Sequence, residues 1–261
     1  MNGKDIRINR ITKNGRMLCV PMDHGISIGP VSGLNNISET INQVDIGGAS
    51  AILTHKGIIK SLTTPPNTGV IIHLSASTDI GLSPNRKLQV CSVEEAIRLG
   101  ADAVSVHVNI GGKEESEMLV KLGNVADQCD EWQIPFIAMM YPRGENIKNP
   151  RDGQIAAHVA RIGSELGADI VKTPYTGNID EFREVVKGCT SPIVIAGGPK
   201  TDNDAEILQM AKDAIESGAI GVTFGRNVFQ HKNPQKIIKA LSKVVLDDLS
   251  VNEGLAVIKN E

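Results

Sequence analysis

Residues 166–173 read LGADIVKT, in which a glycine and an alanine lead directly into a short run of β-branched residues. The same step recurs as GGASAILT (47–54), LGADAVSV (99–106) and SGAIGVTF (217–224). Glycine is the usual residue where a helix ends in the left-handed conformation. The repeat therefore predicts helix ends that are each followed at once by a strand.

Short apolar runs of this kind occur eight times, at 17–23, 50–56, 69–75, 103–109, 135–141, 169–175, 192–198 and 220–226. Most are separated by segments of helical period, such as 92–100, which opens with the capping-box pair Ser92 and Glu95, and the longer 152–167 and 203–218. The connection 57–69 is short and rich in proline, which argues against a full helix there. The glycine–alanine step precedes every second strand.

Eight alternating units in 261 residues predict an α/β fold, a single-domain (β/α)8 TIM barrel with parallel strands inside and helices outside. We expect the barrel to carry an N-terminal segment (1–16) and a short C-terminal extension (248–261). A doubly wound open sheet is the alternative, but no GxGxxG motif follows the first strand.

The composition limits the possible partners. Hydrophobic residues make up 41% of the chain but aromatic residues only 3%, so Ile, Val, Leu, Ala and Met must fill the core. The net charge is −3 and no long basic run occurs, so we expect no nucleic-acid or membrane partner. The start of the chain lacks the apolar segment of a signal peptide, and the four cysteines form no CxxC pair, which favours a cytoplasmic protein with reduced thiols (Cys19, Cys91, Cys129 and Cys189).

Polar and titratable residues gather where the predicted strands end, which in this fold is where chemistry takes place. Strands seven and eight end in AGGPK (196–200) and FGRN (224–227). Their glycines allow backbone N–H groups to approach an anion, and the loops after these strands are the usual phosphate site of the fold. We therefore expect a phosphate site there, formed by Gly197, Gly198, Gly225 and Arg226. The alternative is that Gly197 and Gly198 only make a tight turn.

Lys172 lies at the end of the sixth strand, and a fully buried lysine is rare unless it is paired or functional. An amine attacks a carbonyl only when it is unprotonated, and we expect burial to lower the pKa of Lys172 and keep the amine uncharged. It could then form a Schiff base with a ketone. The alternative is a structural ion pair with Asp23 or Asp79.

Tyr141 and Asp23 end strands five and one, so both reach the same rim as Lys172. A Schiff-base enzyme needs a proton donor and a base, and a phenol and a carboxylate suit these roles. The alternatives are a rim tyrosine that packs on Pro142 and an aspartate that only caps a turn.

The histidines leave a smaller alternative. His24, His73 and His107 end strands one, three and four and could converge on zinc, but no HxH or HxxxH spacing supports this. His158 and His231 are interpreted as helix-surface or loop residues. Two other strand-end lysines, Lys56 and Lys200, are interpreted as flexible loop cations.

Seven motifs together resemble the archaeal-type class I aldolases over nearly the whole chain: VPMDHG (20–25), LTHKG (53–57), GADAVSVHVN (100–109), AMMYPRG (138–144), GADIVKTPYTG (167–177), VIAGGPK (194–200) and FGRNVFQH (224–231). The resemblance implies a (β/α)8 barrel without metal or cofactor. Lys172 would be the Schiff-base lysine, Tyr141 the proton donor and Asp23 the proton acceptor. The implied substrate- and phosphate-binding positions are Asp23, His24, Gly25, Ile26, Ser27, Tyr141, Pro142, Arg143, Lys172, Gly197, Gly198, Gly225 and Arg226.

Within this family the chain is most similar to transferases of an alternative route to 3-dehydroquinate and aromatic amino acids. They cleave 6-deoxy-5-ketofructose 1-phosphate, release hydroxypyruvaldehyde phosphate and transfer the retained fragment to L-aspartate semialdehyde. His24, Lys56 and Arg143 are candidates for binding the acceptor carboxylate, and the loop 145–153 is a candidate lid. The resemblance also implies a homo-oligomer, such as the decamers common in the family.

Two other functions stay open. The first is a class I fructose-bisphosphate aldolase, a lyase; such enzymes tend to carry an aromatic residue two positions before the catalytic tyrosine, where this chain has Met139. The second is a non-catalytic barrel that binds phosphosugars.

Overall fold

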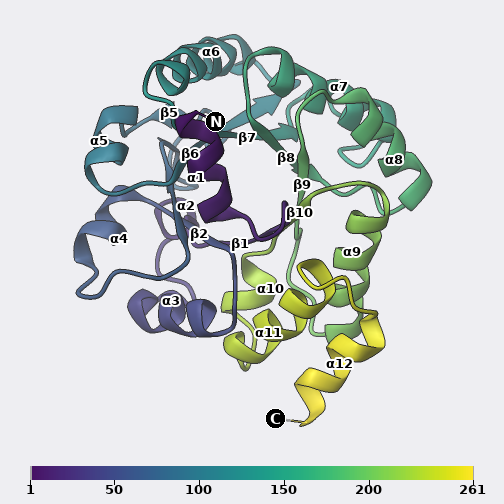
Figure 1. Ribbon diagram of the computed structural model, residues 1–261. Coiled ribbons are helices and arrows are strands. Elements are labelled where there is room, and N and C mark those ends of the chain that lie inside the picture. The colour runs from purple at the N-terminus through teal and green to yellow at the C-terminus, as the bar shows by residue number, and fades with distance from the viewer. Residues whose placement is uncertain (1, 261) are drawn as a thin grey trace.

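Eight parallel strands close into a barrel in the computed structural model, which describes residues 2–260, with the helices arranged around it (Figure 1). Around the barrel the strands follow the order β1-β10-β9-β8-β7-β6-β3-β2. Their bounds are β1 Met17–Pro21, β2 Ala51–Thr54, β3 Gly69–His73, β6 Ala103–Ile110, β7 Phe136–Pro142, β8 Ile170–Pro174, β9 Ile193–Ala196 and β10 Gly221–Thr223. The predicted fold and all eight predicted strands are confirmed.

Twelve helices are present in the described part of the chain. Their bounds are α1 Gly3–Ile11, α2 Gly25–Ile28, α3 Ile37–Ile46, α4 Lys56–Ser61, α5 Val93–Arg98, α6 Glu115–Glu131, α7 Gly153–Glu165, α8 Ile179–Gly188, α9 Asp204–Glu216, α10 Arg226–Phe229, α11 Pro234–Val245 and α12 Val251–Asn260. The short α4 lies in the connection 57–69, where a full helix was not expected. A hairpin that was not predicted, β4 Ser75–Ala76 with β5 Leu88–Gln89, follows β3.

The glycine–alanine repeat is a recurring helix end. Gly167 has a φ of 93°, its N–H donates to the Ser164 carbonyl at 3.2 Å, and the N–H of Ala168 donates to the Gly163 carbonyl at 3.1 Å. This pattern satisfies the last carbonyls of the helix and turns the chain directly into β8. Gly48, Gly100 and Gly218 also have positive φ, and the alanine after each of them donates in the same way.

The predicted capping box at Ser92 is only half formed. The Ser92 hydroxyl accepts from the Glu95 N–H at 3.1 Å. The Glu95 carboxylate turns away and accepts from Lys56 at 2.8 Å and Lys60 at 3.1 Å. The lysines of α4 therefore tie α4 to α5.

Alternate residues of each strand face the barrel interior, because side chains in a strand alternate between two faces. On β8, Ile170 belongs to the inner apolar cluster and Val171 to the outer one beneath the helices. Lys172 follows in phase with Ile170, so its side chain enters the barrel. The position of the amine is thus set by the period of the strand.

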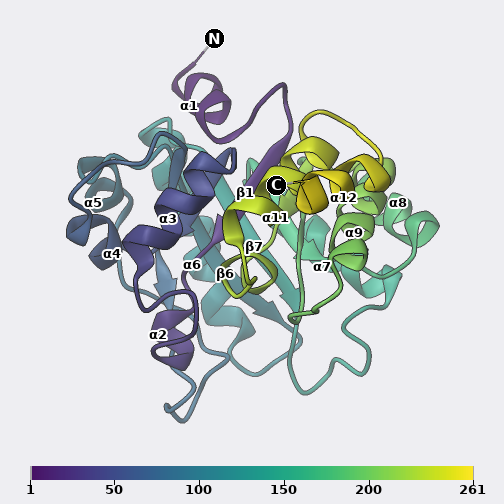
Figure 2. The ribbon, with the colours of Figure 1, turned by 90° about the horizontal axis from the view of Figure 1, so that it is seen from below.

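The helix α1 closes the amino-terminal end of the barrel. Its last residue, Ile11, is fully buried in the inner apolar cluster. Figure 2 shows α1 at one end of the molecule, while α2 and the long loops that follow the strands lie at the other. The N-terminal segment is therefore a plug that leaves the opposite end of the barrel free for chemistry.

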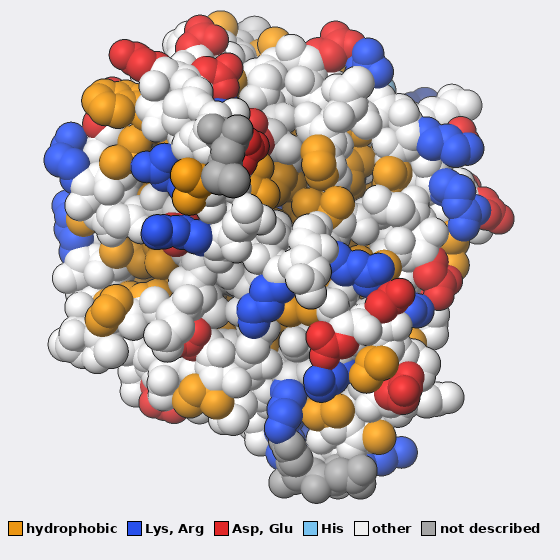
Figure 3. All heavy atoms as spheres, viewed as in Figure 1, with side chains coloured by type: hydrophobic (Ala, Val, Ile, Leu, Met, Phe, Trp, Pro, Cys, Tyr) orange, Lys and Arg blue, Asp and Glu red, His pale blue; other side chains and the backbone are white. Residues whose placement is uncertain are grey.

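Figure 3 shows the face of the molecule that carries α1, over which charged side chains of both signs are scattered. Two hollows lie at this end. Arg10, Asn67 and Thr68 line both of them. No residue of the carboxyl-terminal mouth lines either hollow, so neither belongs to the site described below.

The C-terminal extension forms α12, which packs on α9 and α11. A Cβ atom at Gly254 would lie 2.9 Å from Val244 Cγ2, so the glycine permits this close approach. Within residues 2–260, no helix has the length and apolar character needed to cross a bilayer. The four cysteines are free and buried.

Candidate active site

Lys172 lies inside the carboxyl-terminal mouth of the barrel and is 6% exposed. Its register partners on the neighbouring strands are Met139 of β7 and Val194 of β9. The amine interacts electrostatically with Tyr141 and Asp23. Among the described residues no carboxylate forms an ion pair with it, so the structural ion pair with Asp23 or Asp79 is not found.

The charge of Lys172 differs from the expectation. Burial disfavours the ammonium, but the Tyr141 phenol and the Asp23 carboxylate outweigh burial and raise the pKa of Lys172 above its ordinary value. The expected lowering of the pKa is therefore wrong for the unliganded chain. At neutral pH the amine is protonated, and it must lose a proton before it can attack a ketone.

Asp23 follows β1, and its side chain is 20% exposed. Its carboxylate oxygens lie 3.6 Å from His24 Nδ1 and 4.0 Å from His73 Nε2. Burial works against the ionised form, but His73, His24 and the Lys172 ammonium outweigh it and hold the pKa of Asp23 well below its usual value. Asp23 is thus an ionised base beside a protonated amine.

The histidines of the mouth are kept neutral. His73 Nδ1 is 2.7 Å from the Ser105 hydroxyl, and the His55 ring lies 5.3 Å from the His73 ring. Burial lowers the pKa of His73 to about 3 although Asp23 opposes this shift, and burial also lowers the pKa of His55 and of His24. His55 Nε2 and His24 Nδ1 are buried without a hydrogen-bond partner in residues 2–260, so both are suited to a bound polar group.

The zinc arrangement considered for His24, His73 and His107 is not found. His24 packs edge-on against Phe229 at 5.1 Å, and His107 Nε2 is 2.8 Å from the Asn109 side-chain oxygen. No group of three His, Cys, Asp or Glu side chains in the described chain is arranged to hold a metal ion.

Tyr141 is half-buried at the end of β7. Its ring lies 4.7 Å from the His107 ring, and the Arg143 guanidinium lies 5.5 Å from the ring centre. Pro142 between them is buried, whereas Arg143 is exposed. The tyrosine therefore packs with His107 and Arg143 and also interacts with Lys172.

The residues after Asp23 form the single turn α2. Gly25 and Ile26 are exposed on this turn. The Ser27 hydroxyl donates to the Ser77 carbonyl at 3.1 Å, and its carbonyl accepts from the Asp79 N–H at 2.9 Å. The turn is therefore tied to the loop that follows β3.

The loops after β9 and β10 are joined by Asn227, a buried residue that the sequence analysis did not single out. Its side-chain amide donates to the Gly197 carbonyl at 3.0 Å, and its oxygen accepts from the Thr201 N–H at 2.9 Å. Arg226 donates to the Gly198 carbonyl at 3.0 Å. These bonds hold the predicted phosphate loops together, and the only advance signal was the position of Asn227 in the FGRN motif.

Gly198 and Gly225 meet different backbone demands in these loops. Gly198 has a φ of 66°, a conformation that favours glycine. A Cβ at Gly225 would lie 2.8 Å from both the Pro21 carbonyl oxygen and His24 Cε1. Gly198 is therefore consistent with the tight turn of the alternative, whereas Gly225 brings β10 against the DHG motif.

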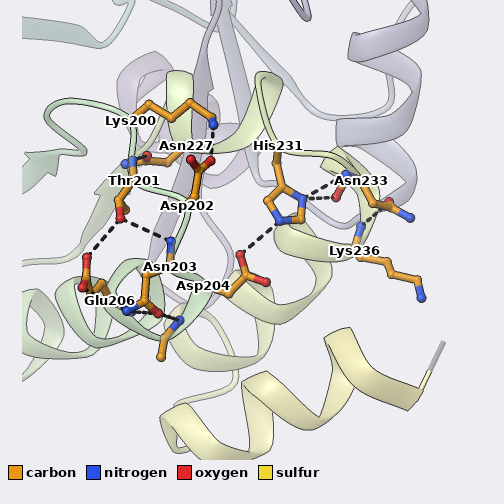
Figure 4. Close-up of polar contacts among 11 residues, drawn as sticks. Lys200, Thr201, Asp202, Asn203, Asp204, Glu206, Asn227, His231, Asn233 and Lys236 are labelled. Carbon is orange, nitrogen blue, oxygen red and sulfur yellow. Dashed lines mark hydrogen bonds and ion pairs between the residues drawn. The ribbon is translucent and has the colours of Figure 1, made fainter.

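The rival cations Lys56 and Lys200 are held by carboxylates. Lys56 pairs with Glu95, and Lys200 pairs with Asp202 (Figure 4). His231 lies in the same view, with Nε2 3.1 Å from Asp204 Oδ1 and Nδ1 2.8 Å from the Asn233 carbonyl oxygen. Lys56 begins α4 and is not a loop cation, whereas Lys200 lies in the loop after β9. His231 links α9 to the loop before α11.

One residue of the mouth was missed altogether. Lys87, just before β5, is 8% exposed. Its ammonium interacts electrostatically with His107, His55 and Asp23. It follows no predicted strand, so the rule that chemistry lies at strand ends could not find it.

Residues 17–231 match the family described as DeoC/LacD family aldolase. The 2-amino-3,7-dideoxy-D-threo-hept-6-ulosonate synthase 1 of Archaeoglobus fulgidus is 45% identical over 255 residues, 97% of this chain and 95% of that protein. The 2-amino-4,5-dihydroxy-6-oxo-7-(phosphonooxy)heptanoate synthase of Streptomyces griseus is 39% identical over 246 residues, 93% of this chain and 90% of that protein.

A solved structure has the same fold. It is an archaeal fructose-1,6-bisphosphate aldolase whose catalytic lysine is covalently bound to the carbinolamine intermediate of the substrate. The two chains superpose with a TM-score of 0.85 and 29% identity, over 92% of this chain and 98% of that one.

Proposed function

The chain belongs to the DeoC/LacD family of aldolases, and from this premise we propose that it is a transferase of the transaldolase type with Lys172 as its Schiff-base amine. The reaction is that of the 2-amino-3,7-dideoxy-D-threo-hept-6-ulosonate synthases, the name carried by the Archaeoglobus relative. It transfers a three-carbon unit from 6-deoxy-5-ketofructose 1-phosphate to L-aspartate semialdehyde.

The observation that carries the proposal is a buried amine that faces the barrel interior beside a phenol and an ionised carboxylate. A nucleophile, a proton donor and a base in one pocket are the groups that imine chemistry requires. A barrel that only binds phosphosugars needs none of them, and the relatives carry the names of synthases.

The first half of the reaction forms and uses the imine. The Lys172 ammonium first loses its proton to solvent, and the free amine then adds to the C5 ketone of the donor. Tyr141 protonates the carbinolamine oxygen, which leaves as water. Asp23, the proton acceptor, then takes the proton of the C3 hydroxyl as the C3–C4 bond breaks, and the electrons of that bond move into the iminium. Hydroxypyruvaldehyde phosphate leaves, and an enamine of carbons C4–C6 stays on Lys172.

The second half reverses this chemistry with a new aldehyde. The enamine carbon attacks the aldehyde carbon of L-aspartate semialdehyde. The resulting alkoxide takes a proton from the base that became protonated in the first half of the reaction. Water then adds to the iminium, and hydrolysis frees Lys172. The product is a seven-carbon 2-amino acid with a ketone at C6 and a methyl group at C7, which agrees with the name of the synthase.

We assign substrate contacts to the loops around the mouth. Asp23–Ser27 and Tyr141–Arg143 form one part, and the loops with Gly197–Gly198 and Gly225–Arg226 form the phosphate-binding part. The bonds from Asn227 and Arg226 that hold these two loops together support this assignment.

The second candidate is cleavage of fructose 1,6-bisphosphate, the reaction of the aldolase of known structure at 29% identity. Met139, at the position where such lyases tend to carry an aromatic residue, is buried in the inner apolar cluster beneath Tyr141. Its linear side chain leaves no ring to stack on a substrate, which favours the transferase.

Dependence on the acceptor separates the two candidates. Release of hydroxypyruvaldehyde phosphate should require L-aspartate semialdehyde for multiple turnovers, because without it the enamine stays on Lys172. Rapid release of triose phosphates from fructose 1,6-bisphosphate without an acceptor would instead identify a lyase.

We also propose that the chain works as a cytoplasmic homo-oligomer. The resemblance supports this, together with the large apolar side chains at the tip of the loop after β3, where Ile80 and Leu82 are almost fully exposed. Light scattering on the purified protein tests the oligomeric state.

A further inference from the structure

Two cations without an anionic partner face the mouth next to Tyr141. Lys87 comes from the end of the loop between β4 and β5, and Arg143 from the end of β7. The ammonium of Lys87 donates to the Ser77 hydroxyl at 2.5 Å, and the Arg143 guanidinium lies over the Tyr141 ring. Within residues 2–260, neither forms an ion pair with a carboxylate.

The position of Lys87 is fixed by bonds on both sides. The buried Lys121 of α6 donates to the Lys87 carbonyl at 2.5 Å and to the His107 carbonyl at 2.7 Å. The Asn109 side-chain amide donates to the Asn85 carbonyl at 2.8 Å. The loop is therefore bonded to β6 and α6, so that the Lys87 side chain is directed inward by its backbone.

The neighbouring Arg86 strengthens this anchoring on the outer side. Its guanidinium makes two bonds to the Glu117 carboxylate of α6, at 2.7 and 3.0 Å. Paired bonds of this kind fix geometry as well as adding energy. Arg86 is thus neutralised by Glu117 outside the barrel, whereas the adjacent Lys87 has no carboxylate partner inside it among residues 2–260.

The charges around Lys87 favour the binding of an anion. Burial and the charge of Arg143 lower the pKa of Lys87, although Asp79 and Asp23 oppose this shift. Holding a buried ammonium near a guanidinium is unfavourable unless an anion binds between them. An oxyanion held by both would remove the repulsion and form charge-assisted hydrogen bonds.

The proposed reaction supplies such an anion. The aldehyde that leaves and the aldehyde that adds react at the same enamine carbon, so their aldehyde carbons occupy the same place. Behind that carbon, hydroxypyruvaldehyde phosphate carries a phosphate and L-aspartate semialdehyde a carboxylate. The phosphate is assigned to the loops after β9 and β10, which lie across the ring from β3 and β6, so the side of the mouth that carries Lys87 is left for the carboxylate.

We propose that Lys87, together with Arg143, forms an anion subsite that binds the carboxylate of the aldehyde acceptor and so selects it. This rests on the proposed transferase function and adds a specificity residue to it. Lys121 is a positioning residue, since it holds the Lys87 backbone. Of the earlier candidates for this role, Arg143 is kept, and Lys56 is set aside because Glu95 neutralises it.

The test is steady-state kinetics of Lys87→Met with two acceptors, L-aspartate semialdehyde and propanal, which has no carboxylate. The KM for L-aspartate semialdehyde should rise about 10- to 100-fold, because a charged hydrogen bond is lost. The KM for propanal should change less than about twofold. Lys113→Met is the matched control, because Lys113 is an exposed lysine near the same rim, and it should change neither KM.

The KM of the keto-sugar phosphate identifies the source of the anion. An unchanged value is expected, because the donor phosphate is assigned to the loops after β9 and β10. A parallel rise would show that Lys87 holds the donor phosphate and would overturn the assignment of the subsite to the acceptor carboxylate. An unchanged KM for L-aspartate semialdehyde in Lys87→Met overturns the proposal in either case.

A second variant keeps the proposal testable if Lys87→Met does not fold. Lys87→Arg keeps the charge and should restore most of the preference for L-aspartate semialdehyde over propanal. If Lys87→Met is unfolded and Lys87→Arg is folded but lacks the preference, the proposal is wrong. Imine trapping at Lys172 in the unmodified protein separates this proposal from the proposed function. If trapping fails, the proposed function is wrong. If trapping succeeds and Lys87→Met has an unchanged KM for L-aspartate semialdehyde, only the subsite is refuted.

Discussion

His73 Nε2 lies 4.0 Å from Asp23 Oδ2, so a neutral imidazole faces an ionised carboxylate across the barrel mouth. Asp23 favours the charged form of His73, but burial outweighs this effect and the fold holds His73 in its uncharged form. This relationship makes the stability of the protein depend on pH.

The His73→Gln substitution should flatten that dependence. The pKa of His73 is about 3 in the folded chain and about 6.5 in an unfolded one, so between these values only the unfolded state binds the proton. Stability therefore falls as the pH falls through this window, by about 2 kcal/mol between pH 6.5 and pH 5. Urea unfolding at several pH values measures the slope. The exposed His158 supplies the control His158→Gln, and an equal slope in all three proteins would contradict the prediction.

The Asp23→Asn substitution should lower the pKa of Lys172. The carboxylate of Asp23 is one of the groups that raise this pKa, so its removal leaves burial less opposed. The pH at which the amine becomes reactive should move to lower values, while the catalytic rate falls because the base is lost. Rates of imine trapping measured against pH give the midpoint. Asp79 interacts electrostatically with Lys87 and not with Lys172, so Asp79→Asn should leave the midpoint of imine trapping unchanged.

The Asn227→Ala substitution should loosen the loops that we assign to phosphate. Two bonds inside the fold are lost, which costs about 1–3 kcal/mol of stability. The KM for the sugar phosphate should rise more than kcat falls, since Asn227 positions the loops and makes no contact with Lys172. Asn227→Asp keeps an acceptor for the Thr201 N–H but cannot donate to the Gly197 carbonyl, and it should show an intermediate effect. A KM equal to that of the unmodified protein would refute the role of Asn227.

The Ile11→Ala substitution should destabilise the barrel from its closed end. Ile11 is fully buried at the bottom of the inner cluster, and such truncations cost about 2–5 kcal/mol. Catalytic constants should stay close to those of the unmodified protein, because the mouth is at the other end. Ile6→Ala on the exposed side of the same helix should change stability by less than about 0.5 kcal/mol. A loss of kcat in Ile11→Ala would show that the plug also shapes the active site.

The sequence was sufficient for the barrel because two signals agreed. Strand runs alternated with helical periods, and the glycine–alanine step marked the helix ends before β2, β6, β8 and β10. The inward direction of Lys172, in phase with Ile170, follows from the strand period only once β8 is placed in the barrel. The plug formed by α1 was not predicted, since its single inward residue, Ile11, has no pattern that distinguishes it from a surface helix.

The site was predictable where a side chain ends a strand, as for Lys172, Tyr141 and Asp23. It was not predictable where the residue arrives from a loop or acts through backbone bonds. Lys87 enters the mouth through a hairpin of four paired residues, too short to show a strand pattern. The charge of Lys172 was also wrong, because the balance between burial and two neighbours depends on distances that the sequence does not contain.

Covalent trapping tests the central role of Lys172 most directly. The protein is incubated with 6-deoxy-5-ketofructose 1-phosphate, reduced with borohydride, digested and mapped by mass spectrometry. Lys121 is the strongest internal rival, since burial lowers the pKa of its amine to about 7, but two carbonyls occupy that amine. We expect one label, on Lys172, and none in Lys172→Ala. A label on Lys121, Lys87 or Lys56, or full turnover by Lys172→Ala, would contradict the mechanism.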